Sequence, residues 1–253
     1  MFTATVIKST KQHIISFIWQ HILLAISLFI MTFGVALSVR SALGSSVIST
    51  IPFVMSIAGA DHMAPALTIG EYTYWMNAIF VVLQIALLRK RFKPVQLFQL
   101  LIGFAFGYFL DLNMALTSLL DIESIYSQIA AQLFGCTILG CGIAFEIRCG
   151  SVTMPGEGIS VAVAQVFHIP FPKAKIIVDT LLVAIAVALG YWFFGMWLWN
   201  VVGVGTLFAM IYVGAFVRFI DPHMQWFSRL LHYTPGFRRY IFGLARYVNR
   251  LKK

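Results

Sequence analysis

Long apolar stretches alternate with short polar segments along almost the whole chain. Six of these stretches are long enough for a helix to cross a hydrocarbon core about 30 Å thick, namely 14–39, 71–88, 95–118, 127–147, 174–194 and 197–219. The strands of a transmembrane barrel would instead alternate polar and apolar residues over about ten positions. The pattern therefore predicts an all-α, polytopic membrane protein.

Two further apolar segments, 44–59 and 155–170, are shorter and contain helix breakers. These breakers are Gly44, Pro52, Gly59, Pro155, Gly156, Gly158 and Pro170. We expect both segments to be re-entrant, entering the membrane and returning to the same side. The alternative is that both cross fully, which gives eight spans.

The charges that flank the spans favour the re-entrant arrangement, because positive residues collect on the cytoplasmic side of a membrane. With six spans, Lys8, Lys11, the basic loop 89–93 and the C-terminal tail all lie on the cytoplasmic side. Eight spans would place Lys8 and Lys11 outside. The acids expected outside in the six-span arrangement are Asp61, Glu71, Asp121 and Glu123.

The two halves of the chain resemble each other in sequence. Gly34-Val-Ala-Leu-Ser-Val-Arg40-Ser matches Gly142-Ile-Ala-Phe-Glu-Ile-Arg148-Cys. A short Gly-rich segment and two long apolar stretches follow each copy, and then an aspartate, Asp111 or Asp221. Asn77 and Asp179 occupy comparable places in the first of those stretches.

Because each half holds three predicted spans, the second half must enter the membrane from the opposite side. Repeat 1 covers about 14–118 and repeat 2 about 127–221, and together they form one transmembrane domain over 1–221. An inverted repeat of this kind is typical of secondary transporters. The alternative is a chance similarity between segments rich in small apolar residues.

Composition supports a membrane protein and separates off the C-terminal tail. Of 253 residues, 60% are hydrophobic and 11% are charged, against about 25% charged in soluble domains. Seven of the 18 Lys and Arg residues follow Asp221, and no acid does. Residues 222–253 are therefore expected to form a basic amphipathic helix on anionic lipids. A partner-binding helix would show the same pattern. Nucleic-acid binding is not expected, because no known binding module accompanies the charge.

Other chemistry is sparse. The sequence offers no metal-binding cluster and no nucleophile beside a base, so we expect no metal, no cofactor and no enzyme activity. The three cysteines, Cys136, Cys141 and Cys149, are expected to be reduced. The oligomeric state is left open, with a homo-oligomer as one alternative.

Two arginines lead the candidates for a solute site. Arg40 and Arg148 occupy equivalent positions just before the two short segments. Helix N-termini carry partial positive charge and free amide donors, so two cations beside two broken helices predict a site for an anionic solute. The alternative is that both side chains snorkel to lipid headgroups.

Further polar side chains could line the same path. Ser45 and Ser46 lie in the first short segment and Glu157 in the second. Glu157 would hold a coupling ion or proton, pair with Arg148, or lie in solvent as a loop acid. Asn77 would line the path or form an interhelical hydrogen bond.

The spacing of two other acids limits their partners, and a structural role is expected for Asp179. Asp179 follows Lys175 by four residues, which predicts an ion pair on one helix face. Glu146 precedes Arg148 by only two residues and cannot face it on a helix, so Glu146 needs another partner or water.

The chain resembles the YczE/YyaS/YitT class of bacterial integral membrane proteins. The resemblance is carried by Gly34-Val-Ala-Leu, by Ala42-Leu-Gly44-Ser-Ser, and by Gly205-Thr-Leu-Phe-Ala-Met-Ile-Tyr-Val-Gly214 with Asp221. Members typically show a proline soon after the first Gly-Ser pair, whereas here Val47 follows Ser46. The resemblance implies the bacterial cytoplasmic membrane and a role related to transport.

Residues and resemblance together predict a secondary transporter or facilitator of a small, anionic solute in the bacterial cytoplasmic membrane. Both termini are expected in the cytoplasm, and Arg40, Arg148 and Glu157 near the solute path. The alternative is a non-transporting assembly or regulatory subunit that binds a partner through its C-terminal tail.

Single-cysteine accessibility in intact cells tests the six-span topology. Single probe cysteines replace residues 10, 61, 122, 173 and 245 in a background without the three native cysteines. We expect an impermeant thiol reagent to label only positions 61 and 122. Labelling at 10 together with protection at 61 would contradict six spans and favour eight.

Overall fold

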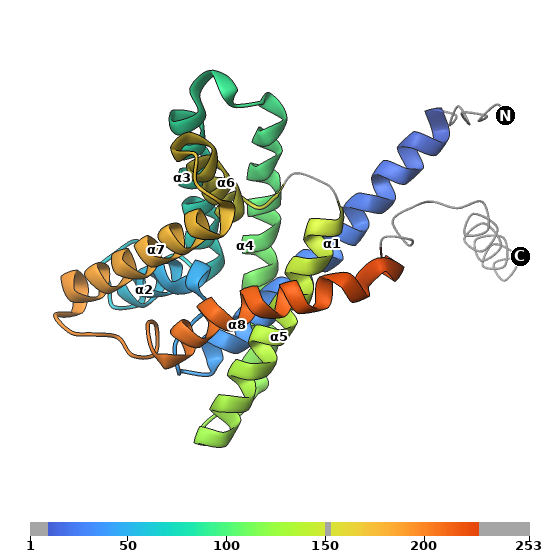
Figure 1. The fold of residues 1–253 in the computed structure, drawn as a ribbon. Helices are drawn as coiled ribbons and strands as arrows, with labels where there is room; N and C mark the ends of the chain where they lie inside the picture. The colour runs from blue at the N-terminus through green and yellow to red at the C-terminus, as the bar shows by residue number, and fades with distance from the viewer. Residues whose placement is uncertain (1–9, 150–152, 228–253) are drawn as a thin grey trace, which may run out of the picture.

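The computed structural model describes residues 10–149 and 153–227, and this part of the chain is all-α, as predicted (Figure 1). Its α-helices are α1 Thr10–Arg40, α2 Thr50–Ala60, α3 Ile69–Leu88, α4 Gln99–Leu116, α5 Ile125–Cys149, α6 Pro155–Phe167, α7 Phe171–Phe194 and α8 Val204–Ile220. The predicted C-terminal amphipathic helix falls mostly beyond residue 227 and so lies outside the described residues.

Within the described residues, six helical stretches are long and apolar enough to cross a membrane, which confirms the predicted number. They are Ile18–Arg40, Ile69–Arg91, Pro94–Leu119, Ile125–Cys149, Phe171–Phe194 and Val204–Phe227. Large apolar side chains project from them, and Leu101 and Ile211 are 64% and 75% exposed. Such surfaces are unfavourable in water and suit a lipid environment, so the chain is a multi-pass membrane protein.

Local chemistry explains where the helices differ from their predicted bounds. α3 begins at Ile69 because the Thr68 side chain accepts from the Glu71 backbone and Glu71 accepts from the Thr68 backbone, which completes a capping box. The stretch predicted over 197–219 becomes a helix only at Val204. α7 ends at Phe194, because the next residue, Gly195, has a φ of +66° that stops the helix, and a loop over 196–203 follows.

The two short helices do not reach across a membrane. α2 has 11 residues and α6 has 13, and at 1.5 Å per residue each is about 20 Å long or less. The turn that leads into α2 meets the N-terminal end of α6 inside the bundle, because a Cβ atom on Gly156 would lie 2.6 Å from Ile48 Cδ1 and 4.0 Å from the Phe80 ring. Phe80 is the middle residue of the span Ile69–Arg91. Both short helices therefore start near mid-depth.

The ends of the bundle carry opposite charge. The turn between α3 and α4 contains Arg89, Lys90 and Arg91, and we call this end the basic end. The opposite end, called the acidic end, holds Asp61 and the start of α3 with Glu71.

The helices pack in two matching sets around α1 and α5, which lie side by side (Figure 1). α4 packs on α1 as α8 packs on α5, and α6 packs on α3 as α2 packs on α7. α2 also packs on α3 as α6 does on α7. These pairs are what two similar halves, α1–α4 and α5–α8, related by a pseudo-twofold axis would make.

The axis passes where α1 and α5 approach most closely. A Cβ atom on Gly34 would lie 2.4 Å from the Leu139 backbone nitrogen, and one on Gly142 would lie 2.4 Å from Met31 Cγ. Gly34 and Gly142 are the aligned glycines of the two repeats. Small residues thus let the two central helices touch backbone to backbone.

One pair of helices breaks this symmetry. α3 packs closely along α4, and Gly70 and Gly107 touch, since a Cβ on Gly70 would meet the Gly107 carbonyl oxygen. The corresponding helices of the second half, α7 and α8, are not a closely packed pair among the described residues. We call the first contact the α3–α4 seam and the second region the α7–α8 gap.

Gly34→Val tests the central crossing. The added side chain would meet the α5 backbone, which cannot move aside as a flexible side chain would. We therefore expect the free energy of unfolding to fall by about 1–3 kcal/mol or more. Thermal unfolding of the purified protein in detergent measures the effect. The control is Gly214→Ala on α8, where a Cβ has nothing within 4 Å. An unchanged melting temperature for Gly34→Val would contradict the crossing.

Candidate functional site

A cavity of about 290 Å³ occupies the α7–α8 gap. α1, α5 and the N-terminal end of α6 complete its walls. The apolar residues that line it include Met31, Ile48, Leu139, Ile143, Ile147, Met154, Phe171, Met210, Val213 and Val217. A mostly apolar cavity of this size with a few polar groups is typical of small-molecule sites.

Three charged side chains line the cavity: Glu157, in the first turn of α6, and Lys175 and Asp179 on α7. Lys175 Nζ lies 2.8 Å from Asp179 Oδ1, which confirms the predicted ion pair. The Glu157 carboxylate interacts electrostatically with both partners of that pair. It accepts no hydrogen bond from residues 10–149 or 153–227, so it is available to a ligand.

A second carboxylate stands behind Glu157. Glu146 on α5 is only 4% exposed, and its Oε1 accepts a hydrogen bond of 2.9 Å from the Met154 backbone N–H. Its Oε2 has no hydrogen-bond partner in the described part of the chain. Glu146 is close enough to Glu157 for the two carboxylates to repel each other. The partner that Glu146 needed is therefore the backbone leading into α6.

The two predicted arginines lie elsewhere, and neither lines the cavity. Arg40 Nη2 donates to the Met114 carbonyl oxygen at 2.9 Å, at the C-terminal end of α4. Arg148 forms an ion pair of 2.8 Å with Asp221, just past the C-terminal end of α8. Cations at helix C-termini satisfy free carbonyl groups and the negative end of the helix dipole. Each arginine therefore binds the C-terminal end of the last helix of its own repeat.

The predicted serines are close to the cavity but bonded within the protein. Ser45 Oγ donates to the Val201 carbonyl oxygen at 3.1 Å and fastens the first short segment to the α7–α8 loop. Ser46 lines the cavity, and its hydroxyl lies 2.8 Å from that of Ser49. Of the six predicted site residues, Ser46 and Glu157 are therefore brought together.

Asn77 lies in the α3–α4 seam, beside Gly103, and is fully buried. Neither its amide nitrogen nor its amide oxygen has a hydrogen-bond partner among the residues that the structure describes. Asn77 is the ninth residue of α3 and Asp179 the ninth of α7. The same position thus faces a cavity in one half and is sealed in the other.

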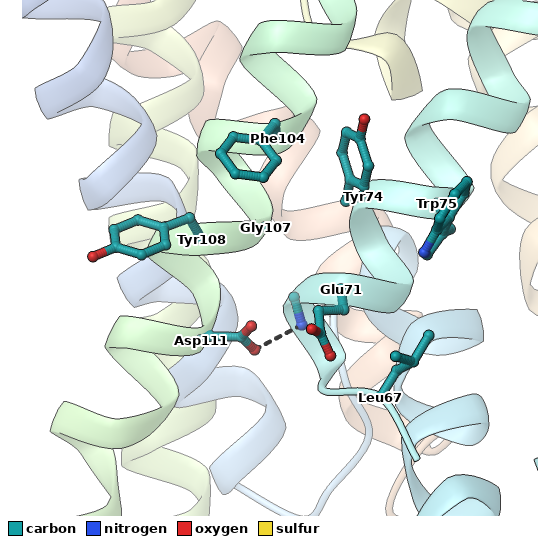
Figure 2. Close-up of a pocket in the computed structure, with 9 residues that line it drawn as sticks. Leu67, Glu71, Tyr74, Trp75, Phe104, Gly107, Tyr108 and Asp111 are labelled. Atoms are coloured by element: carbon teal, nitrogen blue, oxygen red, sulfur yellow. Dashed lines mark hydrogen bonds between the residues drawn. The ribbon is translucent and has the colours of Figure 1, made fainter. Parts of the chain in front are cut away.

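A second pocket, of about 370 Å³, lies on the outer side of the α3–α4 seam (Figure 2). Tyr74 and Trp75 from α3 and Phe104 and Tyr108 from α4 line it, and Trp75 and Tyr108 are more than half exposed. Aromatic side chains of this kind suit a lipid-facing groove near an interface.

The carboxylate of that pocket holds the seam closed. Asp111 accepts hydrogen bonds from the Gly70 N–H at 2.8 Å and from the Thr68 hydroxyl at 2.6 Å, and Figure 2 shows the former. Asp111 on α4 thereby caps the first turn of α3. Asp221, its expected counterpart, instead pairs with Arg148. The two aspartates thus differ in role, because Asp111 binds the N-terminal end of a helix whereas Asp221 binds an arginine.

Gln132 on α5 is a further connecting residue. Its Oε1 accepts from Ser38 and Ser41 at 3.0 and 2.8 Å, and its Nε2 donates to the Gly205 carbonyl oxygen at 2.8 Å. It joins the end of α1 to the start of α8. A glutamine within an apolar span is a weak sequence signal for such a bridge.

The chain belongs to the family described as "Family of unknown function (DUF6198)", which it matches over residues 18–222. The match covers both short helices and five of the six spans in full, and it covers the sixth, Val204–Phe227, up to residue 222. No curated protein and no solved structure matches the chain.

Cysteine reactivity distinguishes the open gap from the closed seam. In a cysteine-free background, we expect Glu157→Cys to react with a small methanethiosulfonate reagent at least about tenfold faster than Asn77→Cys, because position 157 lines the cavity and position 77 is sealed. Mass spectrometry of the detergent-purified protein measures both rates. Equal rates, or faster labelling at 77, would contradict the arrangement.

Proposed function

We propose that this member of the DUF6198 family is a secondary transporter or facilitator that moves a small solute through the α7–α8 cavity. The observation that carries the proposal is the asymmetry between two otherwise matching halves. α3 and α4 are packed together, whereas α7 and α8 enclose a cavity with charged side chains. Ionisable side chains inside a membrane are costly, and they often mark the path of a solute or an ion.

An inverted repeat allows the two halves to exchange conformations. If the α3–α4 seam opened while the α7–α8 gap closed, the result would be the present structure with its two membrane sides interchanged. Such an exchange would move access to the centre from one side of the membrane to the other.

Asn77 supports this exchange. A fully buried amide without hydrogen bonds costs roughly 1–3 kcal/mol. Opening of the seam would place Asn77 on the wall of a cavity, as Asp179 is placed now in the other half. Water or solute would then bind its amide. The energetic cost in the closed seam is therefore relieved in the other state.

The cavity faces the basic end. Phe171 and Lys175 lie in the first turns of α7, and Ile147 and Val217 near the last turns of α5 and α8. Because basic loops lie in the cytoplasm, we propose that this cavity opens to the cytoplasm. Both termini are then cytoplasmic, in the bacterial inner membrane that the YczE/YyaS/YitT resemblance implies. We also propose that the chain is a relative of that class.

The alternative of a partner-binding subunit depends on the C-terminal tail, most of which lies outside the described residues. No described feature favours it over transport. Catalysis is not proposed, because no nucleophile with an adjacent base is found among the residues that line the cavity.

Cross-linking the seam tests the exchange. Tyr74 and Phe104 face each other across the seam, with ring centroids 5.5 Å apart. In a cysteine-free background, Tyr74→Cys with Phe104→Cys is joined by a short reducible bifunctional thiol reagent. We expect flux in proteoliposomes to fall to that of protein-free vesicles and to recover on reduction. The labelled probes are benzyltrimethylammonium, benzenesulfonate and xylitol.

The control cross-link joins α5 to α8, a contact that the first half also makes, between α1 and α4. Thr137 and Tyr212, whose hydroxyl oxygens lie 3.1 Å apart, are replaced by cysteine and joined in the same way. We expect this cross-link to leave at least about half of the flux. Protein-dependent flux that persists with the seam locked would contradict the exchange, and absence of flux for all three probes would contradict the proposed function.

A further inference from the structure

We infer that the α7–α8 cavity binds a small organic cation, with its charge on an otherwise apolar body, an inference that rests on the proposed transport function and specifies its substrate class. This is the opposite charge to the one expected from Arg40 and Arg148. The two arginines bind helix C-termini outside the cavity. The charge of the preferred ligand therefore depends on the side chains that line the cavity.

Those charges are acidic. Among the residues that line the cavity, the two carboxylates of Glu157 and Asp179 face one ammonium, that of Lys175. Lys175 is committed to Asp179 at 2.8 Å. Among the described residues, Glu157 has no cation in contact, and a second carboxylate, Glu146, lies behind it. A single positive charge at Glu157 would neutralise the cavity and offset the cost of holding a carboxylate in a medium of low dielectric constant.

The dipole of α6 is also consistent with a cation, because carboxylates already lie at the N-terminal end of that helix. The N-terminal end of α6 would attract an anion if it were vacant. Glu157 lies in its first turn, and Glu146 accepts the Met154 backbone N–H. The protein's own carboxylates therefore occupy the position that an anionic solute would take. The dipole favours negative charge at this position, which suits a cation in the cavity better than an anion.

The remainder of the wall selects an apolar body. Met31, Met154 and Met210 line the cavity with flexible, polarisable side chains that adapt to different shapes. Phe171 lies at its rim in the first turn of α7 and offers an aromatic ring to a cation. A bare metal ion would leave this apolar surface unused, whereas an alkylated or aryl ammonium ion would cover it.

Equilibrium binding tests the charge preference without requiring transport. The full-length protein is placed in phosphatidylglycerol nanodiscs, whose headgroups carry no ammonium that could compete. Binding of benzyltrimethylammonium is compared with that of benzenesulfonate and N,N-dimethylbenzamide by isothermal titration calorimetry. We expect the cation to bind at least about tenfold more tightly than either of the other probes.

Two variants and a matched control separate charge from folding. Glu157→Gln keeps the shape of the side chain and should weaken cation binding by at least about tenfold. Lys175→Met removes the competing ammonium and should strengthen cation binding, whereas at an anion site it would abolish binding. Glu123→Gln, an exposed acid between α4 and α5, should bind as the wild type does. Size-exclusion profiles verify that each variant is folded.

The outcomes distinguish this inference from the proposed function. Tighter binding of benzenesulfonate, or unchanged cation binding in folded Glu157→Gln, would overturn the cation site even if flux were present. Selective cation binding that Glu157→Gln weakens, together with no flux of any probe, would support the site and overturn transport.

Discussion

The close crossing of α1 and α5 is the contact on which the rest of the arrangement depends. Gly34 and Gly142 leave no space for a side chain, so the two helices touch along their backbones and define the pseudo-twofold axis. Ile48 and Gly156 each lie eight residues beyond the aligned arginines, and they meet on the same axis. A bulkier crossing would separate the short helices and remove the floor of the cavity.

Irregular backbone at this depth must find its hydrogen bonds within the protein. Polar side chains supply several of them: Ser45 donates to the Val201 carbonyl, Glu146 accepts from the Met154 N–H, and Gln132 donates to the Gly205 carbonyl. These bonds explain why a sequence with so few polar residues places several of them inside its spans. They also hold the short helices so that their positive ends point to the centre.

Much of the fold follows from the sequence, because helix length and helix breakers are local properties. The six long helices, the two short ones and the Lys175–Asp179 pair were all predictable from spacing. The start of α8 at Val204 was not predictable. Residues 197–203 are apolar enough to resemble part of a helix, but the chain turns at Gly195 and forms a loop up to residue 203. The functions of Arg40 and Arg148 depend on which helix ends lie beside them, and one sequence does not contain that information. Neither does it show that α7 and α8 separate where α3 and α4 pack.

The Asp111 cap has a consequence for how such a duplicated protein can diverge. It links α4 to the first turn of α3 in one half, while the other half uses its own aspartate on Arg148. The stability of one conformation is therefore encoded by residues that are absent from the wall of the working cavity. Natural selection could alter how long the molecule stays in either state without changing what it recognises, a separation of timing from specificity that two identical halves could not provide.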